Sequence, residues 1–251
     1  MTQAIDLLTH NTTGTLLNVA GILTGGMLGL LRRKPLSPPK ESFFRVMLGA
    51  FTVYFGLQLT WMSLGGPFFQ IAKQIVIAIL AMILGKLAGR LLHLQKLSNR
   101  LGQVARDKIR DARPDASNRT SDGFETCALL FCAAPLGILG AVEDGLGGYF
   151  YPLALKGVME GLATMGFVSV FGWGSLLAAL PVLALQGSIA LSCARFIEPF
   201  LQTHGLSNSV NAVGGLLVFS VALVILDLKK IALADYLPSL AVAPLLAWAW
   251  R

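Results

Sequence analysis

Charged residues are scarce in this sequence. Only 13% of its 251 residues are Asp, Glu, Lys or Arg, against about 25% in an ordinary soluble domain, while 55% are hydrophobic. A water-soluble core needs less apolar sequence than this, so we expect the lipid bilayer to surround the chain. The net charge of +7 could suggest nucleic acid. Basic residues of a membrane protein belong mostly to its cytoplasmic loops, however, so no nucleic-acid partner is expected.

Cysteine and histidine are rare as well. The three cysteines lie in apolar runs without metal-like spacing, and the three histidines lie at the ends of such runs. A disulfide framework or a zinc site is therefore not expected. The sequence also lacks a Gly-rich phosphate loop, a GxSxG elbow and an HExxH motif. We expect neither an enzyme nor a cofactor, and an intramembrane enzyme that uses carboxylates is a lesser alternative.

Long apolar runs are abundant. A membrane-spanning helix needs roughly 20 apolar residues. Eight segments satisfy this: 14–32, 44–63, 68–92, 124–142, 149–171, 174–195, 209–227 and 234–250. Only Gly172-Trp173-Gly174 separates the fifth from the sixth, so seven complete spans are the alternative. We predict an all-α, polytopic transmembrane helix bundle that forms a single domain over residues 1–251.

The basic residues predict the orientation of the bundle. They gather in the connection RRKPLSPPKESFFR, in the connection 93–123 and in DLKK at 227–230. An arrangement of eight helices places all three on one side, which should be the cytoplasm, and both termini in the periplasm. Within 93–123, LSNRLGQVARDKIRDA is expected to extend the third helix along the membrane surface. The following RPDASNRTSDG is expected to be a flexible linker.

Glycines recur at four-residue spacing in three of the apolar segments. They are Gly21, Gly25 and Gly29, then Gly85 and Gly89, then Gly157 and Gly161. Residues four apart share a helix face, and glycine lets a second helix backbone approach closely. The stripes predict tight helix pairs within the chain, and a homodimer seam along one stripe is the alternative.

Two distant segments are similar to each other. Residues 46–59 resemble residues 211–224, with Gly49 aligned to Gly214 and Val53 to Val218. Helices one to three would then correspond to helices six to eight in the opposite orientation. Inverted repeats of this kind recur in transporters, with a site near the middle of the bilayer.

Polar side chains interrupt the first and sixth predicted helices. Asn18 lies in the first and Gln186 in the sixth, at broadly equivalent places if the repeat exists. Such amides often tie helices together at modest gain in stability. The alternative is that they coordinate an ion or solute.

Four charged residues lie within eighteen positions of the otherwise apolar centre: Glu143, Asp144, Lys156 and Glu160. Lys156 and Glu160 share one helix face, and Glu160 lies near the middle of its span. A charged residue there costs roughly 2.5–3.5 kcal/mol, so it should pair, become neutral or line a wet cavity. The glycines after Asp144 would turn both preceding carboxylates toward Lys156.

These residues allow two interpretations. One is a buried Lys156–Glu160 ion pair, with Glu143 and Asp144 in water at the outer surface. The other is a substrate or coupling-ion site, in which Glu160 carries a proton in one state and releases it in another. The site would then comprise all four charged residues, with Asn18 and Gln186 as polar helpers.

Several segments resemble the YqgA/YdfK-like family of bacterial inner-membrane proteins, which is grouped under a domain of unknown function, DUF554. They are GTLLNVAGILTGGMLG (14–29), LLFCAAPLGILGAVEDGL (129–146), LKGVMEG (155–161), ALPVLALQGSIAL (179–191), AVGGLLVFSVAL (212–223) and YLPSLAVAPLL (236–246). The resemblance covers nearly the whole chain and implies a multi-pass protein of the bacterial inner membrane. In that family an aspartate is usual at the position of Glu160, which keeps the carboxylate. The resemblance brings no established substrate.

We therefore expect a transporter that moves a small ion or polar solute by alternating access. The first alternative is a non-transporting scaffold or sensor that acts through its basic connection, and the second is an ion channel. The expected partners are the solute, the lipid bilayer and, along a glycine stripe, a second copy of the chain.

Overall fold

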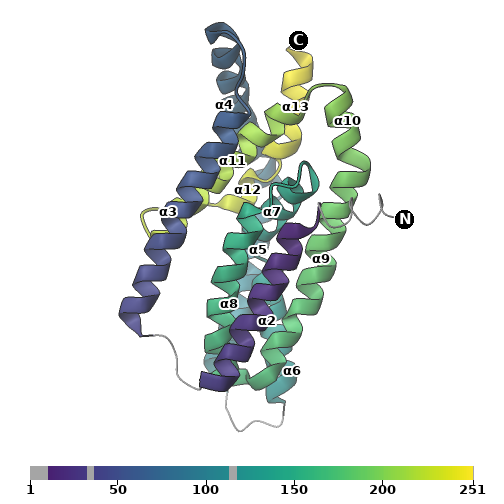
Figure 1. Ribbon diagram of the computed structural model, residues 1–251. Helices are drawn as coiled ribbons and strands as arrows, with labels where there is room; N and C mark the ends of the chain where they lie inside the picture. The colour runs from purple at the N-terminus through teal and green to yellow at the C-terminus, as the bar shows by residue number, and fades with distance from the viewer. Residues whose placement is uncertain (1–10, 33–36, 113–117, 251) are drawn as a thin grey trace, which may run out of the picture. The chain divides into compact units, whose positions relative to one another are not determined.

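The computed structural model of the protein describes residues 11–32, 37–112 and 118–250, which contain helices and no strands (Figure 1). The α-helices are α2 (Thr13–Arg32), α3 (Pro38–Met62), α4 (Phe68–Leu91), α5 (Leu94–Asp111), α6 (Arg119–Cys132), α7 (Pro135–Gly145), α8 (Tyr151–Phe171), α9 (Ala179–Ser192), α10 (Glu198–Thr203), α11 (Ser207–Ile225), α12 (Leu233–Tyr236) and α13 (Ser239–Ala249). A 3-10 helix, Gly172–Ala178, precedes α9, and a π-helical turn, Cys193–Ile197, follows it. The predicted all-α fold is confirmed.

Among the described residues, five helical runs are long and apolar enough to cross a membrane, or six if the bent pair α6–α7 counts as one span. One of the five, Tyr151–Thr203, contains both α8 and α9. These two helices run in opposite directions along α2. Asn18 of α2 contacts Gln186 of α9, and Gly26, further along α2, contacts Leu176 in the 3-10 helix before α9. Residue numbers along α9 thus fall as those along α2 rise, so the two helices are antiparallel. That run therefore passes alongside α2 twice, as the sequence predicted for its fifth and sixth helices.

Two of the eight predicted spans are interrupted. The fourth, 124–142, is broken between Cys132 and Pro135, where the chain bends by 61°. The eighth, 234–250, is divided into α12 and α13, and its apolar helical run Leu233–Ala249 is shorter than the other spans. Proline at the start of α7 and at position 238 explains both breaks, because a proline nitrogen has no hydrogen to donate.

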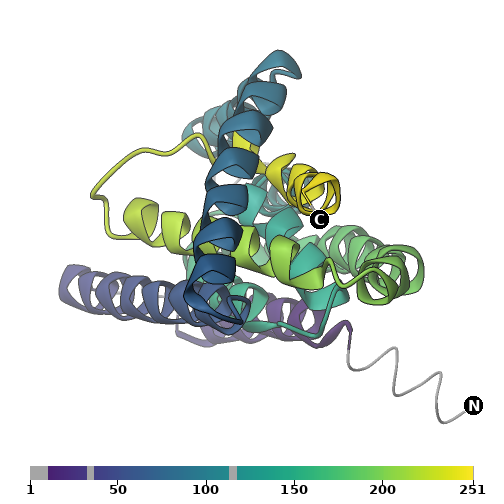
Figure 2. The ribbon, with the colours of Figure 1, turned by 90° about the horizontal axis from the view of Figure 1, so that it is seen from above.

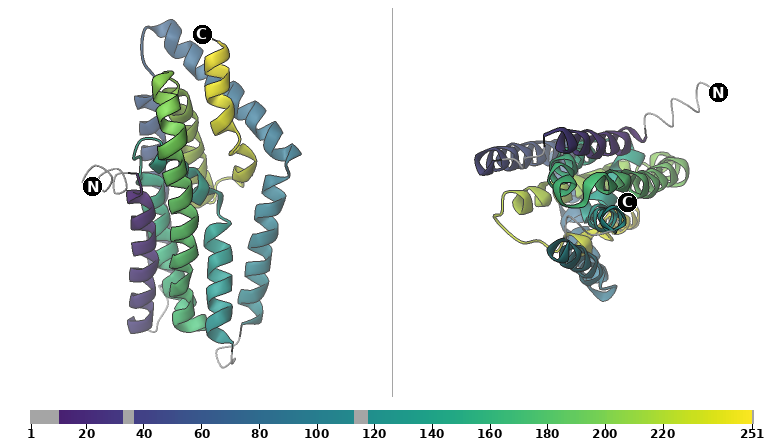
Figure 3. Two further views of the ribbon diagram at one scale, coloured as in Figure 1. Left: turned by 90° about the vertical axis from the view of Figure 1, so that its right-hand side faces the viewer. Right: turned by 90° about the horizontal axis from the view of Figure 1, so that it is seen from below.

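The contacts divide the chain into two compact units. Unit 1 comprises residues 1–43 and 98–192, and unit 2 comprises residues 44–97 and 193–251. The single membrane domain expected from the sequence therefore contains two units. Within unit 2, α4 packs against α12 and α13, seen from above in Figure 2. Within unit 1, α2 lies beside α8 and α9 (Figure 3).

Glycines bring α2 and α8 into backbone contact. A Cβ atom on Gly21 would collide with the carbonyl group of Gly157, and one on Gly25 with that of Gly161. One turn further, a Cβ on Gly29 would lie 2.7 Å from the carbonyl oxygen of Met165. Any larger residue at these positions of α2 would force the helices apart.

The stripe on α4 is also covered inside the chain. Gly85 lies against the backbone of Ser239, and Gly89 against that of Asp235. All three glycine stripes thus face helices of the same chain. These contacts favour helix pairs within the chain over a homodimer seam along a stripe.

The long connection folds differently from the expectation. The third helix does not continue through it, because His93 has a left-handed backbone (φ 55°) that ends α4 before α5 begins. In the expected linker, residues 119–123 are the first turn of α6, and residues 113–117 lie outside the described residues. Arg119 is anchored there, since its guanidinium group donates to the carbonyl oxygens of Ser169 (3.0 Å) and Val170 (2.7 Å) at the end of α8.

Candidate functional site

The break between α6 and α7 exposes a backbone carbonyl inside unit 1. In a continuous helix the oxygen of Phe131 would accept a hydrogen bond from residue 135, but Pro135 has no N–H group. The ammonium group of Lys156 takes that place, since its Nζ donates to the Phe131 oxygen over 3.1 Å. The broken helix thus supplies one polar partner for the lysine.

The second partner of Lys156 is Glu160, one turn further along α8. Lys156 Nζ forms an ion pair and a hydrogen bond with Glu160 Oε1. Lys156 is 2% exposed and Glu160 is 6% exposed, so both charges lie inside the protein. The thiol of Cys132, at the end of α6, lies close enough to both groups to interact electrostatically with them. The predicted pairing on one helix face is confirmed.

Two amides complete the cluster. Asn18 Nδ2 donates to Gln186 Oε1 over 3.0 Å, which joins α2 to α9, and the Asn18 side chain also neighbours the Glu160 carboxylate. Gln186 meets Lys156 above Gly137 of α7. A Cβ on Gly137 would lie 3.0 Å from Gln186 Nε2 and 3.0 Å from Lys156 Cε. Asn18, Lys156, Glu160 and Gln186 are therefore neighbours, and we call them the Lys156 cluster.

The Lys156 cluster has hydrogen-bonding capacity left over. Within the described part of the chain, neither Asn18 Oδ1 nor Glu160 Oε2 has a hydrogen-bond partner, although both atoms are buried. Buried acceptors are nearly always satisfied in folded proteins. Two oxygens are thus available to a proton, a water molecule or a bound polar group.

Asp144 has a different role from the one expected. It is fully buried, and its Oδ2 accepts a hydrogen bond from the backbone nitrogen of Thr15 over 3.2 Å. Thr15 lies in the first turn of α2, and no acidic residue of α2 itself stands there. Asp144 therefore caps α2, where the positive end of the helix dipole favours a carboxylate. The interpretation that placed Asp144 in water at the outer surface is wrong, because the side chain is buried, while its predicted part in a substrate or ion site stays a prediction.

Glu143 is also buried, with 1% of its surface exposed. Its Oε1 has no hydrogen-bond partner, and the side chain has no ion pair among the residues that the structure describes. In the part of the chain that the structure describes, Lys156 forms an ion pair with Glu160 and none with Glu143. The interpretation that placed Glu143 in water is wrong as well, because its side chain is buried.

Sequence reasoning missed two parts of the site. The carbonyl of Phe131 and the small residue Gly137 cannot be recognised as partners of a lysine from residue type alone. Pro135 was the available signal, because it marks the carbonyl four residues earlier as lacking its helical donor. No group of three or more His, Cys, Asp and Glu side chains in residues 11–32, 37–112 and 118–250 is placed to hold a metal ion.

Comparison with known proteins gives the family. The model of a protein family of unknown function, DUF554, matches residues 13–248. The chain is 29% identical over 231 residues to the uncharacterized membrane protein YdfK of Bacillus subtilis (strain 168), which covers 92% of this chain and 93% of the relative. It is 29% identical over 240 residues to the uncharacterized protein YqgA of Escherichia coli (strain K12), covering 94% and 97%. No solved structure matches significantly. Together with its apolar helices, the matched length identifies the chain as a membrane protein that belongs to the DUF554 family.

Proposed function

We propose that the protein carries a small ion or polar solute across the bacterial inner membrane by alternating access, and that the Lys156 cluster binds it. The observation that carries the proposal is the buried Lys156–Glu160 pair beside a broken helix. Ionisable residues within a membrane are costly, and they typically mark substrate and ion pathways. Transporter sites are commonly built where a discontinuous helix offers free backbone groups.

The arrangement of the cluster supports this role over a simple structural pair. The carbonyl oxygen of Phe131 gives Lys156 a second partner besides Glu160. If a solute or a proton binds to the Glu160 carboxylate, the ammonium group of Lys156 therefore keeps its hydrogen bond to the Phe131 oxygen. The unfilled acceptors Asn18 Oδ1 and Glu160 Oε2 are the atoms that a donor group on the solute would meet.

The pairing of helices also favours a transporter plan. The suspected repeat relates α2 to α9, α3 to α11, and α4 to α12–α13. Each of these pairs is in contact, and in each the two helices run antiparallel. Asn18 bonds to Gln186 in the first pair; Gly49 and Gly56 meet Leu226 and Gly215 in the second; and Gly85 and Gly89 meet Ser239 and Asp235 in the third. Repeats inverted about an axis in the membrane plane would give such pairs.

The test is flux through the purified protein in sealed liposomes. Charge movement on a solid-supported membrane is recorded while cations, carboxylates, amino acids and sugars are applied at several pH values. We expect a saturable response to one class of solute, reduced at least tenfold in Glu160→Gln and in Lys156→Met. The matched control is Glu125→Gln, which removes a carboxylate from the exposed Lys108–Glu125 ion pair. It should leave the response within twofold of the unchanged protein.

Three outcomes would contradict the proposal. One is the absence of a response to any solute class from a folded protein. Another is a response that Glu160→Gln and Lys156→Met leave intact. The third is a flux that does not saturate and shows no exchange of solute, which would indicate an ion channel. A cellular phenotype that disappears only when residues 96–123 are deleted would favour the scaffold or sensor.

A further inference from the structure

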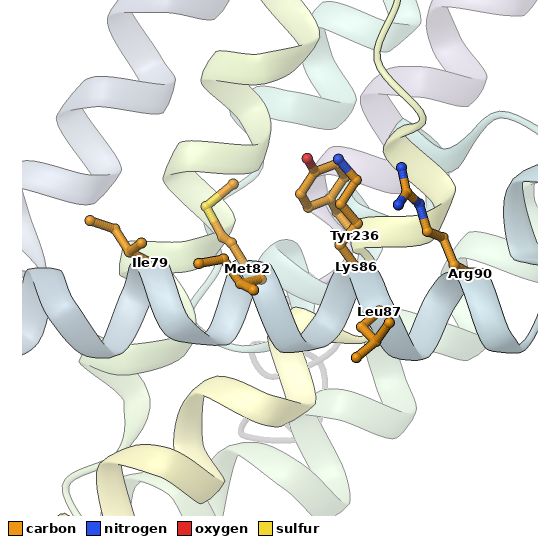
Figure 4. A pocket seen from close by; sticks show the side chains of 7 residues that line it. Ile79, Met82, Lys86, Leu87, Arg90 and Tyr236 are labelled. Carbon is orange, nitrogen blue, oxygen red and sulfur yellow. The ribbon is translucent and has the colours of Figure 1, made fainter.

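Two basic residues of α4 stand beside an apolar groove in unit 2. The groove has a volume of about 560 Å³, and its lining includes Lys86, Arg90 and Tyr236 (Figure 4). Lys86 and Arg90 are four residues apart, and Figure 4 shows both side chains directed to the same side of α4 as Tyr236. Lys86 Nζ lies 4.9 Å from the centre of the Tyr236 ring, within the range of a cation–π interaction.

Neither basic group has an acidic partner. No ion pair involves Lys86 or Arg90 in the part of the chain that the structure describes. The neighbouring carboxylate on α12 is Asp235, and it is engaged elsewhere, because its Oδ1 accepts the backbone N–H of Gln95 over 2.9 Å. The groove therefore presents two positive charges that have no ion-pair partner among the described residues.

The rest of the groove is apolar and open to the outside of the fold. Ile79 and Ile83, two turns and one turn before Leu87, are 49% and 58% exposed, and Met82 lies between them in the lining. By helical rise, Lys86 lies about 27 Å and Arg90 about 33 Å from the start of α4 at Phe68. A hydrocarbon core is about 30 Å thick, so the two cations lie on either side of its boundary with the headgroups, while the isoleucines lie among acyl chains.

We propose that this groove binds an anionic phospholipid, with the phosphate between Lys86 and Arg90 and an acyl chain along Ile79 and Ile83. The charge of the lipid complements the two cations. The Tyr236 hydroxyl group lies beside them and adds a hydrogen-bond donor for a phosphate oxygen. Basic pockets between transmembrane helices on the cytoplasmic side are a recurrent form of lipid site. The distribution of basic residues assigns this end of α4 to that side.

Native mass spectrometry of the full chain in detergent provides the test, with phosphatidylglycerol and phosphatidylcholine titrated separately. We expect phosphatidylglycerol to bind more tightly than phosphatidylcholine. In the double variant Lys86→Gln/Arg90→Gln its affinity should fall about 30-fold, since each basic residue near an anionic lipid contributes about fivefold. Glycerol 3-phosphate, which has the headgroup charge without acyl chains, should not compete at millimolar concentration.

Two further variants keep the result unambiguous. Lys40→Gln/Arg45→Gln removes the same charge from exposed positions of α3 and should change the affinity by less than threefold. Lys86→Arg/Arg90→Lys keeps both charges and should retain binding, which separates a lost charge from a misfolded groove. Equal binding of both lipids, an unchanged affinity in the Gln double variant, or an equal loss in the α3 control would overturn the proposal. So would full competition by glycerol 3-phosphate.

Discussion

Lys156 donates a hydrogen bond to the Phe131 carbonyl oxygen, at the point where Pro135 interrupts the helix between α6 and α7. One residue thereby satisfies a backbone group that the break left without its donor. The same ammonium group forms an ion pair with Glu160. The lysine thus links the broken helix to α8, and its charge is matched inside the protein. The energetic consequence can be measured by removing the partners singly and together.

A Lys156→Met variant should be less stable by roughly 3 kcal/mol, because it leaves the Glu160 carboxylate and the Phe131 carbonyl buried without a donor. Lys156→Met/Glu160→Leu should recover most of this loss, because an apolar pair of similar size carries no uncompensated charge. Thermal unfolding of the detergent-purified protein, followed by loss of the monodisperse peak, measures both. A double variant that is less stable than either single variant would show that the pair contributes net stability.

A Gly25→Ala variant should separate α2 from α8. Its Cβ would collide with the carbonyl group of Gly161, and overpacking of this kind costs about 1–3 kcal/mol. The matched control is Gly166→Ala on α8, where a Cβ meets nothing within 4 Å. It should be neutral or stabilising by up to about 1 kcal/mol, since alanine favours the helix. Equal unfolding temperatures for the two variants would contradict the close approach of the backbones.

Asp144→Ala should loosen the first turn of α2, because Thr15 loses the acceptor of its backbone N–H. The expected cost is about 1 kcal/mol, and hydrogen exchange of the Thr15 amide should accelerate. Asp144→Asn keeps an acceptor oxygen and should retain part of the protection. Glu143→Gln changes the adjacent carboxyl group, which has no ion pair among the described residues, and should leave exchange at Thr15 unchanged. If exchange at Thr15 accelerated in the Glu143 variant and not in the Asp144 variants, Asp144 would not be the residue that caps α2.

Patterns along the chain were enough to predict the helices and part of the site. Hydrophobic length predicts a helix in each of the eight apolar segments, and the spacing of four predicts the Lys156–Glu160 pair, because neighbours on a helix are fixed by its pitch. The glycine stripes indicate where backbones approach, although the sequence cannot say whether the partner helix belongs to the same chain. All of these are short-range properties.

The remaining features depend on contacts between distant parts of the chain. Asp144 and Thr15 are 129 positions apart, and no local pattern connects a carboxylate after α7 with the first turn of α2. From the sequence, Asp144 could be assigned either to the charged site or to water at the outer surface, and a cap on α2 was not among the interpretations. Likewise, the divided fourth span depends on Lys156, which satisfies the carbonyl that the break exposes. Such partners are known only once the helices are packed.

The last prediction concerns the sides of the membrane on which the ends of α2 lie. Ser37 follows α2 among basic residues, and Gly147 follows Asp144, which caps the opposite end of the helix. The 20 residues of α2 span about 30 Å, so the two positions should lie on opposite sides. After replacement of the three native cysteines by serine, Gly147→Cys should react with a membrane-impermeant maleimide in intact cells. Ser37→Cys should react only after permeabilisation, because the neighbouring basic residues predict that its side faces the cytoplasm. Labelling of both positions in intact cells would show that α2 does not cross the membrane, and the reverse pattern would invert the proposed orientation.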